Sequence, residues 1–266
     1  MAVYQGVFLF AVSIGPLPGG LLAEHYGLRV PFLAYAFAGV LAAALAWVFI
    51  PETMSVGDPG VPEGPPVPFL SQVRILTGHT GFMLVSLVSF MNAVARTGGL
   101  FNVIPLLAHD RLALNADRIG LGLALASLVG LVVIYPSGVL VDRYGRKSVI
   151  VPATVMAGIS LVLFLLAPSY AWFLAGCVAW SVAAGVGGAA PAAYAADVAP
   201  PGMNAAAMSG FRMLADLGYV VGPIALGLAT DLAGADATLG GTALLLAATA
   251  LLFARFAPET HRREHL

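Results

Sequence analysis

The stretch GVLVDRYGRK, residues 138–147, decides how this chain folds. It follows about twenty uncharged residues, 119–140, and a second apolar run, 148–168, comes after it. Twenty residues of α-helix are about 30 Å long, which matches the hydrocarbon core of a bilayer. The stretch is therefore predicted to be a tight turn between two membrane-spanning helices. Its three bases place that turn on the cytoplasmic side.

The composition indicates a membrane protein and excludes an ordinary soluble domain. Hydrophobic residues make up 60% of the chain and charged residues only 9%. The net charge of -1 gives no basic surface for nucleic acid. The single cysteine, Cys177, lies in an apolar run and excludes an internal disulfide or a cysteine-rich metal site. The N-terminus has no basic region and no A-x-A cleavage signal, so no removable signal peptide is expected.

The pattern G-x-x-x-D-R-x-G-R-K in the charged turn resembles the loop motif of the major facilitator superfamily, a large family of rocker-switch transporters. A positive-inside loop explains the bases and the turn glycine, but not an acid one helical turn after the first glycine. The resemblance implies that this acid lies near residues 1–5, where the positive end of a neighbouring helix attracts it. The bases are expected to pair with acids or with lipid phosphates, and a solvated Lys147 also remains open. The motif positions are Gly138, Asp142, Arg143, Gly145, Arg146 and Lys147.

Hydropathy predicts an all-α, polytopic fold with eight transmembrane helices. If the chain starts inside, the cytoplasmic segments hold eight Lys and Arg residues and the opposite loops hold three. This excess predicts that both termini are cytoplasmic, and we expect the bacterial inner (plasma) membrane. The predicted spans are about 3–23, 30–50, 81–107, 119–141, 148–168, 172–196, 207–230 and 238–257.

An internal repeat relates the first two predicted spans to the last two. One offset, 207 residues, carries Pro16 onto Pro223 and Pro51 onto Pro258. The repeat predicts a unit of six helices, and two units give the twelve helices that the resembled family has. We therefore expect residues 1–50 to be the last two helices of an N-terminal half and residues 81–266 to be the complete C-terminal half. Four helices are then missing from a partial major-facilitator fold.

Residues 51–80 are predicted to be a cytoplasmic linker between these halves. Six prolines and three glycines between residues 51 and 68 forbid a long regular element. Two interpretations of residues 69–76 remain open, a short amphipathic helix on the membrane surface and a plain approach to the next span.

The first predicted span resembles the fifth-helix antiporter motif of the family, g-x-x-x-G-P-x-x-G-G, with Ala11 in place of the first glycine. Prolines kink a helix, and glycines let a neighbouring helix approach closely. The resemblance implies a hinge or seal between the halves and favours drug:proton antiport. The motif positions are Gly15, Pro16, Gly19 and Gly20.

Small residues also form a stripe on the span 119–141, at Gly122, Ala126, Gly130 and Gly138. Such a stripe is expected to contact another helix closely. The resemblance implies that this partner is the helix that bears Gly15 and Pro16.

Arg96 is the strongest candidate for solute contact. It lies near the middle of a predicted span, where a lone charge is expensive and usually faces a cavity or a partner. Ser89, Asn92, Arg96 and Gly99 are spaced three, four and three apart, so they share one helical face. Ser89, Asn92 and Arg96 are predicted to line a substrate cavity, although a structural arginine bound by carbonyls remains possible. Arg212 and Asp216, four residues apart, are expected to pair locally.

No enzyme constellation is present in the sequence. The five histidines lie in predicted loops or in the tail, and His261 and His265 lack a clear third ligand. We expect no catalytic activity, no cofactor and no metal.

The predicted function is transmembrane transport of small molecules, as proton-coupled efflux of drug-like substrates by a full-length parent. The expected partners are a small-molecule substrate, protons and membrane lipid, with no nucleic acid. Two alternatives remain open, uptake of sugars or organic acids and a membrane fragment that does not transport.

Overall fold

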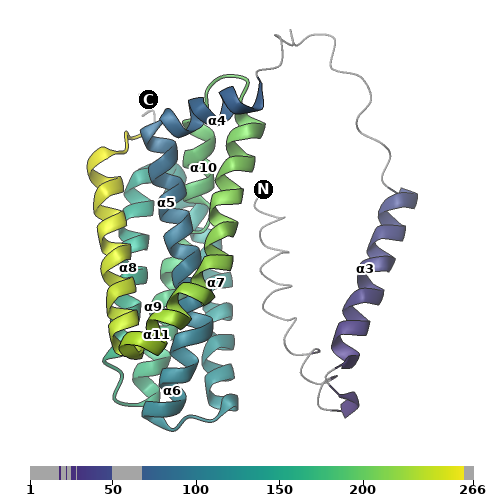
Figure 1. Ribbon diagram of the computed structural model, residues 1–266, viewed down its shortest axis with the longest axis vertical. Coiled ribbons are helices and arrows are strands. Elements are labelled where there is room, and N and C mark those ends of the chain that lie inside the picture. The colour runs from purple at the N-terminus through teal and green to yellow at the C-terminus, as the bar shows by residue number, and fades with distance from the viewer. Residues whose placement is uncertain (1–17, 19–21, 23–24, 28, 50–67, 261–266) are drawn as a thin grey trace. The chain divides into compact units, whose positions relative to one another are not determined.

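The structure is a computed structural model that describes residues 18, 22, 25–27, 29–49 and 68–260 (Figure 1). The chain divides into two compact units, Met1–Val67 and Pro68–Leu266. In the first unit, helix α3, Arg29–Phe49, has no buried residue. An apolar helix exposed all round is typical of a segment that faces lipid. Residues 18 and 22 apart, the predicted span 3–23 lies outside the described residues, as do its antiporter motif positions Gly15, Pro16, Gly19 and Gly20.

The second unit is a helical bundle, and every regular element in its described part is a helix. Helices α5, η1 and α6 follow one another without a break, and α10 is a short helix. The elements are α4 (Phe69–Gly78), α5 (Thr80–Val94), η1 (Ala95–Val103), α6 (Ile104–Leu112), α7 (Ala116–Tyr144), α8 (Arg146–Leu165), α9 (Tyr170–Gly187), α10 (Ala190–Asp197) and α11 (Asn204–Phe256). The all-α prediction is confirmed.

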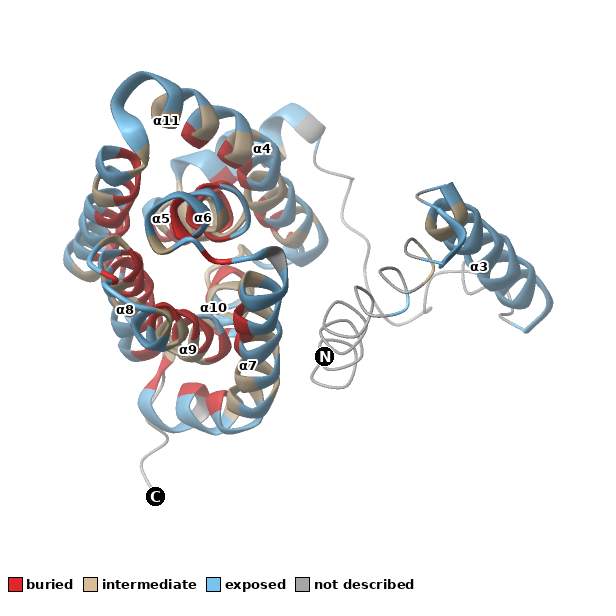
Figure 2. Ribbon diagram, turned by 90° about the horizontal axis from the view of Figure 1, so that it is seen from below, coloured by how far each residue is buried: buried red, intermediate tan, exposed pale blue. Residues whose placement is uncertain are grey.

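Neighbouring helices in the bundle are α5 with α11, α9 with both α7 and α8, and α8 with α11 (Figure 2). Buried side chains form two core clusters. One surrounds Leu161 and Phe173, and the other, nearer the turn between α7 and α8, surrounds Tyr194 and Phe253. The outer faces are also apolar, as exposed Val132 and Leu244 show. Apolar side chains on both faces indicate a protein whose surrounding solvent is lipid.

Helix α11 changes direction at Gly234. Its 53 residues would extend about 80 Å as one straight helix, far more than the roughly 30 Å of a bilayer core. Gly234 has φ 84° and ψ 161°, which is not helical and suits a residue without Cβ. The residues on either side of this break, 204–233 and 235–256, form two arms that correspond to the predicted spans 207–230 and 238–257.

Six helices in the described part of the chain are long and apolar enough to cross a membrane, judged by length and composition. This count does not support the predicted number of eight. The prediction counted the span 3–23, most of which lies outside the described residues, and it divided α11 into two spans. The six helices are Arg29–Phe49, Thr80–Leu112, Asp117–Val141, Arg146–Leu165, Tyr170–Asp197 and Asn204–Phe256.

Candidate functional site

Arg96 lies at the second residue of a π-helix in the middle of the continuous helix 80–112. Its side chain is half-buried, and its guanidinium carbon lies 5.9 Å from the centre of the Phe101 ring. Among the described residues no acidic side chain forms an ion pair with Arg96. The guanidinium can therefore donate hydrogen bonds to an anionic or carbonyl-bearing partner from outside this helix.

Ser89 and Asn92 precede Arg96 by two turns and one turn and are also half-buried. The Asn92 side-chain amide donates a hydrogen bond to Val88 O at 2.9 Å, within its own helix. This leaves the amide oxygen of Asn92 as a further acceptor on the same face. The three predicted cavity residues thus form a continuous polar strip on α5 and the start of η1.

The helix that bears the polar strip packs closely against α11. The residues of this helix that the glycines of α11 approach most closely include Ala93, Val94, Thr97 and Gly98.

The π-helix changes the helical register after Arg96. Ile104 N–H donates to Gly99 O, a step of five residues. Such wide turns occur mostly as short insertions, frequently at functional sites. Gly99 is buried, and a Cβ there would meet Leu161 and Leu239 of the core. The prediction placed Gly99 on the same face by assuming a uniform α-helix, whereas the helix is wider from Ala95 onward and Gly99 packs against the core.

Two glycines of α11, Gly218 and Gly222, hold α5 and η1 unusually close. A Cβ on Gly218 would lie 2.5 Å from Phe90 O, and one on Gly222 would lie 2.7 Å from Thr97 Oγ1. A Cβ on Gly98 would collide with the Gly222 carbonyl. This contact was not predicted from the sequence. The G-x-x-x-G spacing of 218 and 222 was the signal that would have found this contact.

The charged turn lies between α7 and α8. Gly145 alone separates the two helices, with φ 90°, a conformation that favours glycine. Gly138 and Asp142 lie within α7, and Arg143 is exposed, its guanidinium carbon 5.6 Å from the centre of the Tyr144 ring. The structure confirms a turn with no room for a folded domain.

The last two bases of the turn bind other helices of the same unit. Arg146 Nε lies 3.0 Å from Asp197 Oδ2, at the end of α10. Lys147 Nζ donates to Ala257 O, just after α11, at 2.7 Å. Lys147 thus takes neither an acid nor the solvated state that had remained open, because the carbonyl after the end of α11 has no partner in its own helix and accepts from Nζ. Arg146 pairs with an acid as expected.

The segment after α11 is held at the same place. Thr260 Oγ1 donates to Asp197 Oδ2 at 3.1 Å, and the buried Tyr194 donates to Pro258 O at 2.8 Å. Asp197 therefore links the turn after α7 to residues 258–260, which follow α11 and begin with the repeated Pro258. These contacts make the end of this unit that holds the charged turn one connected polar network.

The small-residue stripe of α7 packs against α9. A Cβ on Gly122 would collide with the Phe173 ring, and one on Gly130 would lie 3.8 Å from Ser181 O. Ala126, between them, is buried, whereas nothing lies within 4 Å of a Cβ on Gly138. The helix of Gly15 and Pro16 lies outside the described residues, so the predicted contact of this stripe with it stays a prediction. Small residues show that a close partner exists, but not which helix it is.

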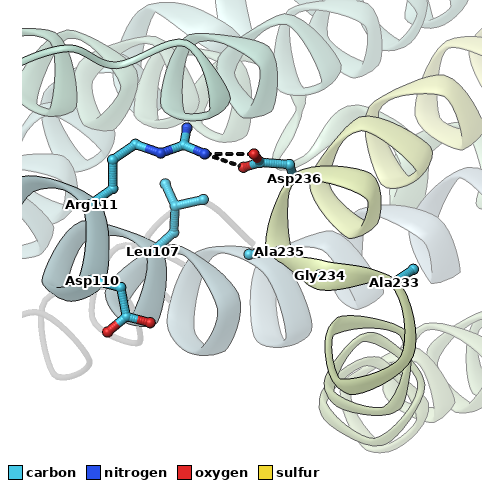
Figure 3. A pocket seen from close by; sticks show the side chains of 7 residues that line it. All are labelled: Leu107, Asp110, Arg111, Ala233, Gly234, Ala235 and Asp236. Atoms are coloured by element: carbon cyan, nitrogen blue, oxygen red, sulfur yellow. Dashed lines mark hydrogen bonds and ion pairs between the residues drawn. The ribbon is translucent and has the colours of Figure 1, made fainter.

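The opposite end of the bundle carries an ion pair that the sequence analysis did not predict. Arg111, at the end of α6, contacts both carboxylate oxygens of Asp236 at 2.5 and 2.6 Å and donates to Leu165 O at 2.6 Å. Figure 3 shows Arg111 and Asp236 pointing toward each other beside the break at Gly234, while Asp110 points away. These residues line a cavity of about 470 Å³. Arg111 thus ties the ends of three helices together.

The long apolar helices and the apolar outer surface define this chain as part of an integral membrane protein. The chain belongs to the Major Facilitator Superfamily, because the model of that family matches residues 82–266, more than half of the sequence. It is therefore a member of a family of membrane transporters, and nothing in the described residues indicates catalytic activity.

Known relatives support the transporter class. An uncharacterized MFS-type transporter of Methanocaldococcus jannaschii is 23% identical over 237 residues, which are 87% of this chain and 60% of that protein. The human solute carrier family 2, facilitated glucose transporter member 12, is 31% identical over 107 residues, 39% of this chain and 16% of that protein. Its mouse counterpart is 29% identical over 147 residues, 54% of this chain and 21% of that protein. This chain thus spans no more than 60% of the length of these relatives.

Proposed function

We propose that the complete transporter to which this chain belongs exports small, drug-like molecules in exchange for protons. The polar strip of Ser89, Asn92 and Arg96 binds the substrate in this proposal. The observation that carries it is Arg96, a half-buried charge inside a spanning helix with no ion pair among residues 68–260. Charges at this depth are retained mainly where a pathway or a partner uses them.

Arg96 favours substrates that carry a carboxylate or another strong acceptor. A guanidinium presents a planar fork of donors that matches two acceptor oxygens at once. The Phe101 ring beside it offers an apolar, π-rich surface. Such a surface suits a ligand that carries both an aromatic and a charged group. A molecule with one anionic group and an aromatic body suits this pair of side chains.

The C-terminal unit moves as a rigid body in the proposed mechanism. Its cytoplasmic end is held by the contacts of Arg146, Lys147 and Asp197, and its opposite end by the contacts of Arg111. The close contact at Gly218 and Gly222 holds α5 and η1, which carry the polar strip, against α11. Rocking of such a unit about a midplane site is one way to alternate access between the two sides.

The direction and the coupling ion rest on the antiporter-like motif of residues 11–20. Uptake of sugars or organic acids is the second candidate, and it is favoured by the similarity to facilitated glucose transporter member 12. The Asn92 amide and the Ser89 hydroxyl are suitable partners for sugar hydroxyls. A membrane protein that does not transport is the third candidate.

Flux measurements in membrane vesicles from cells that express the complete gene product test the proposal. Export in exchange for protons is expected to accumulate substrate in inside-out vesicles with an acid lumen, and not in those with an alkaline lumen. Accumulation in right-side-out vesicles from an acid exterior would instead support uptake. Vesicles without the protein are the control. Flux no greater than in these control vesicles would support the third candidate.

The same proposal includes four further spans that precede Met1 in the complete transporter. It is supported by the 207-residue repeat and by the alignment with only 60% of the archaeal relative. The genomic sequence upstream of Met1 tests it. An in-frame extension with four apolar segments is expected, and a stop codon would argue against this part of the proposal.

A further inference from the structure

Helix α4 runs across the cytoplasmic end of the bundle instead of along it (Figure 1). Only His79 separates it from α5, and His79 forms hydrogen bonds with both helices. His79 N–H donates to Leu76 O at 3.1 Å, and His79 Nδ1 accepts from Phe82 N–H at 3.3 Å. The corner therefore sets the direction of α4 relative to α5.

The apolar face of α4 starts against the bundle and continues beyond it. Leu76, next to the corner, is 6% exposed and belongs to the core cluster of Tyr194 and Phe253. Val73 is 40% exposed and Leu70 is 79% exposed, and these three residues are spaced three apart on one side of the helix. Exposure thus rises along the face as the helix leaves the bundle.

Polar side chains border the apolar face of α4, and one of them is a base, Arg74, that follows Leu70 by one helical turn. Ser71, Arg74 and Thr77 are exposed, and Thr77 Oγ1 donates to Val73 O at 2.8 Å. Arg74 forms no ion pair with any acid of the described segments. An apolar face beside an exposed base is the arrangement of helices that lie in a membrane interface.

Two further arginines mark the interface level at this end of the bundle. Arg143 lies over the ring of Tyr144 at 5.6 Å, where α7 ends, and Arg255 lies over the ring of Phe256 at 5.5 Å, where α11 ends. Both rings are 58% exposed. Aromatic rings and bases at helix ends are typical of the boundary between acyl chains and headgroups. Helix α4 extends beyond the bundle at this same end (Figure 1).

We propose that α4 is an interfacial anchor that binds anionic phospholipid of the cytoplasmic leaflet. Leu70 and Val73 insert among the acyl chains, and Arg74 binds the lipid phosphate. The anchor holds the start of α5 at a fixed depth in the bilayer. This inference goes beyond the proposed transport activity and does not depend on it.

Fluorescence of single labels in the full chain tests the anchor. The variants Leu70→Cys and Ser71→Cys carry an environment-sensitive fluorophore, and the unsubstituted chain, whose Cys177 is fully buried, is the labelling blank. Each variant is reconstituted into phosphatidylcholine vesicles and into vesicles that also contain phosphatidylglycerol, with and without nitroxide on the lipid acyl chains. The label at 70 is expected about 5–10 Å below the headgroup boundary, blue-shifted and quenched by the nitroxide. The label at 71 is expected to resemble a label in water.

The contribution of Arg74 is measured in the Leu70→Cys background. Arg74→Gln is expected to lower the ratio of lipid-buried to water-exposed label about fivefold in vesicles with phosphatidylglycerol, since one base near an anionic surface contributes about 1 kcal/mol. In phosphatidylcholine alone the ratio is expected to stay the same. An equal change in both lipids would overturn the headgroup contact.

Two results at position 70 would overturn the anchor. A blue-shifted label that lipid nitroxide does not quench would show that protein, such as a segment of residues 1–67, covers this face. A label as water-exposed as the one at position 71 would show that the face has no apolar cover.

Discussion

Arg96→Ala is expected to reduce substrate flux about 10- to 100-fold, because a hydrogen bond to a charged group contributes about 1.5–3 kcal/mol. Arg96 forms no ion pair among the described residues, and its guanidinium carbon lies 5.9 Å from the centre of the neighbouring Phe101 ring. Little of the loss should therefore come from unfolding. Flux in vesicles, normalised to the amount of inserted protein, measures the effect.

Arg96→Lys separates two ways of binding the substrate. A lysine keeps the charge but loses the planar fork, so flux is expected to recover in part if a point charge suffices. Recovery should be poor if the guanidinium binds two acceptor oxygens. The matched control is Arg255→Ala, since Arg255 also lies over a neighbouring ring but at the end of α11. Undiminished flux from Arg96→Ala across a broad substrate panel would leave Arg96 with a structural role.

Gly222→Ala is expected to destabilise the C-terminal unit by about 1–3 kcal/mol, the usual cost of overpacking. The new methyl group would lie 2.7 Å from Thr97 Oγ1 and 2.9 Å from Val94 O, so the backbones of α11 and α5 must separate. Gly218→Ala should act alike, because its methyl group would lie 2.5 Å from Phe90 O. The unfolding midpoint in detergent is expected to fall by roughly 2–10 °C.

Gly227→Ala is the matched control on the same helix. Nothing lies within 4 Å of a Cβ at Gly227, so alanine meets no neighbour there. Alanine also favours the helix by about 1 kcal/mol over glycine, so the midpoint should stay the same or rise slightly. If Gly222→Ala were as stable as Gly227→Ala, the close crossing of the two helices would be refuted.

The sequence by itself determined the elements that depend on neighbouring residues. Long apolar runs predicted the helices of the second unit, because a segment without charges can cross a membrane wherever its neighbours lie. The charged turn was predicted because only a short charged stretch separates two such runs. Arg212 and Asp216 were expected to pair locally, and their side chains lie 3.0 Å apart. This contact needs only the pitch of one helix.

The tertiary structure decided which elements meet. Arg111 and Asp236 are 125 residues apart, and only the break at Gly234 brings the carboxylate to the end of α6. In a lipid environment nearly every helix is apolar all round, so hydropathy does not distinguish one partner from another. The shapes of small side chains and the unpaired carbonyls at helix ends make that choice. For this reason Gly122 packs on α9, and Lys147 binds the carbonyl of Ala257.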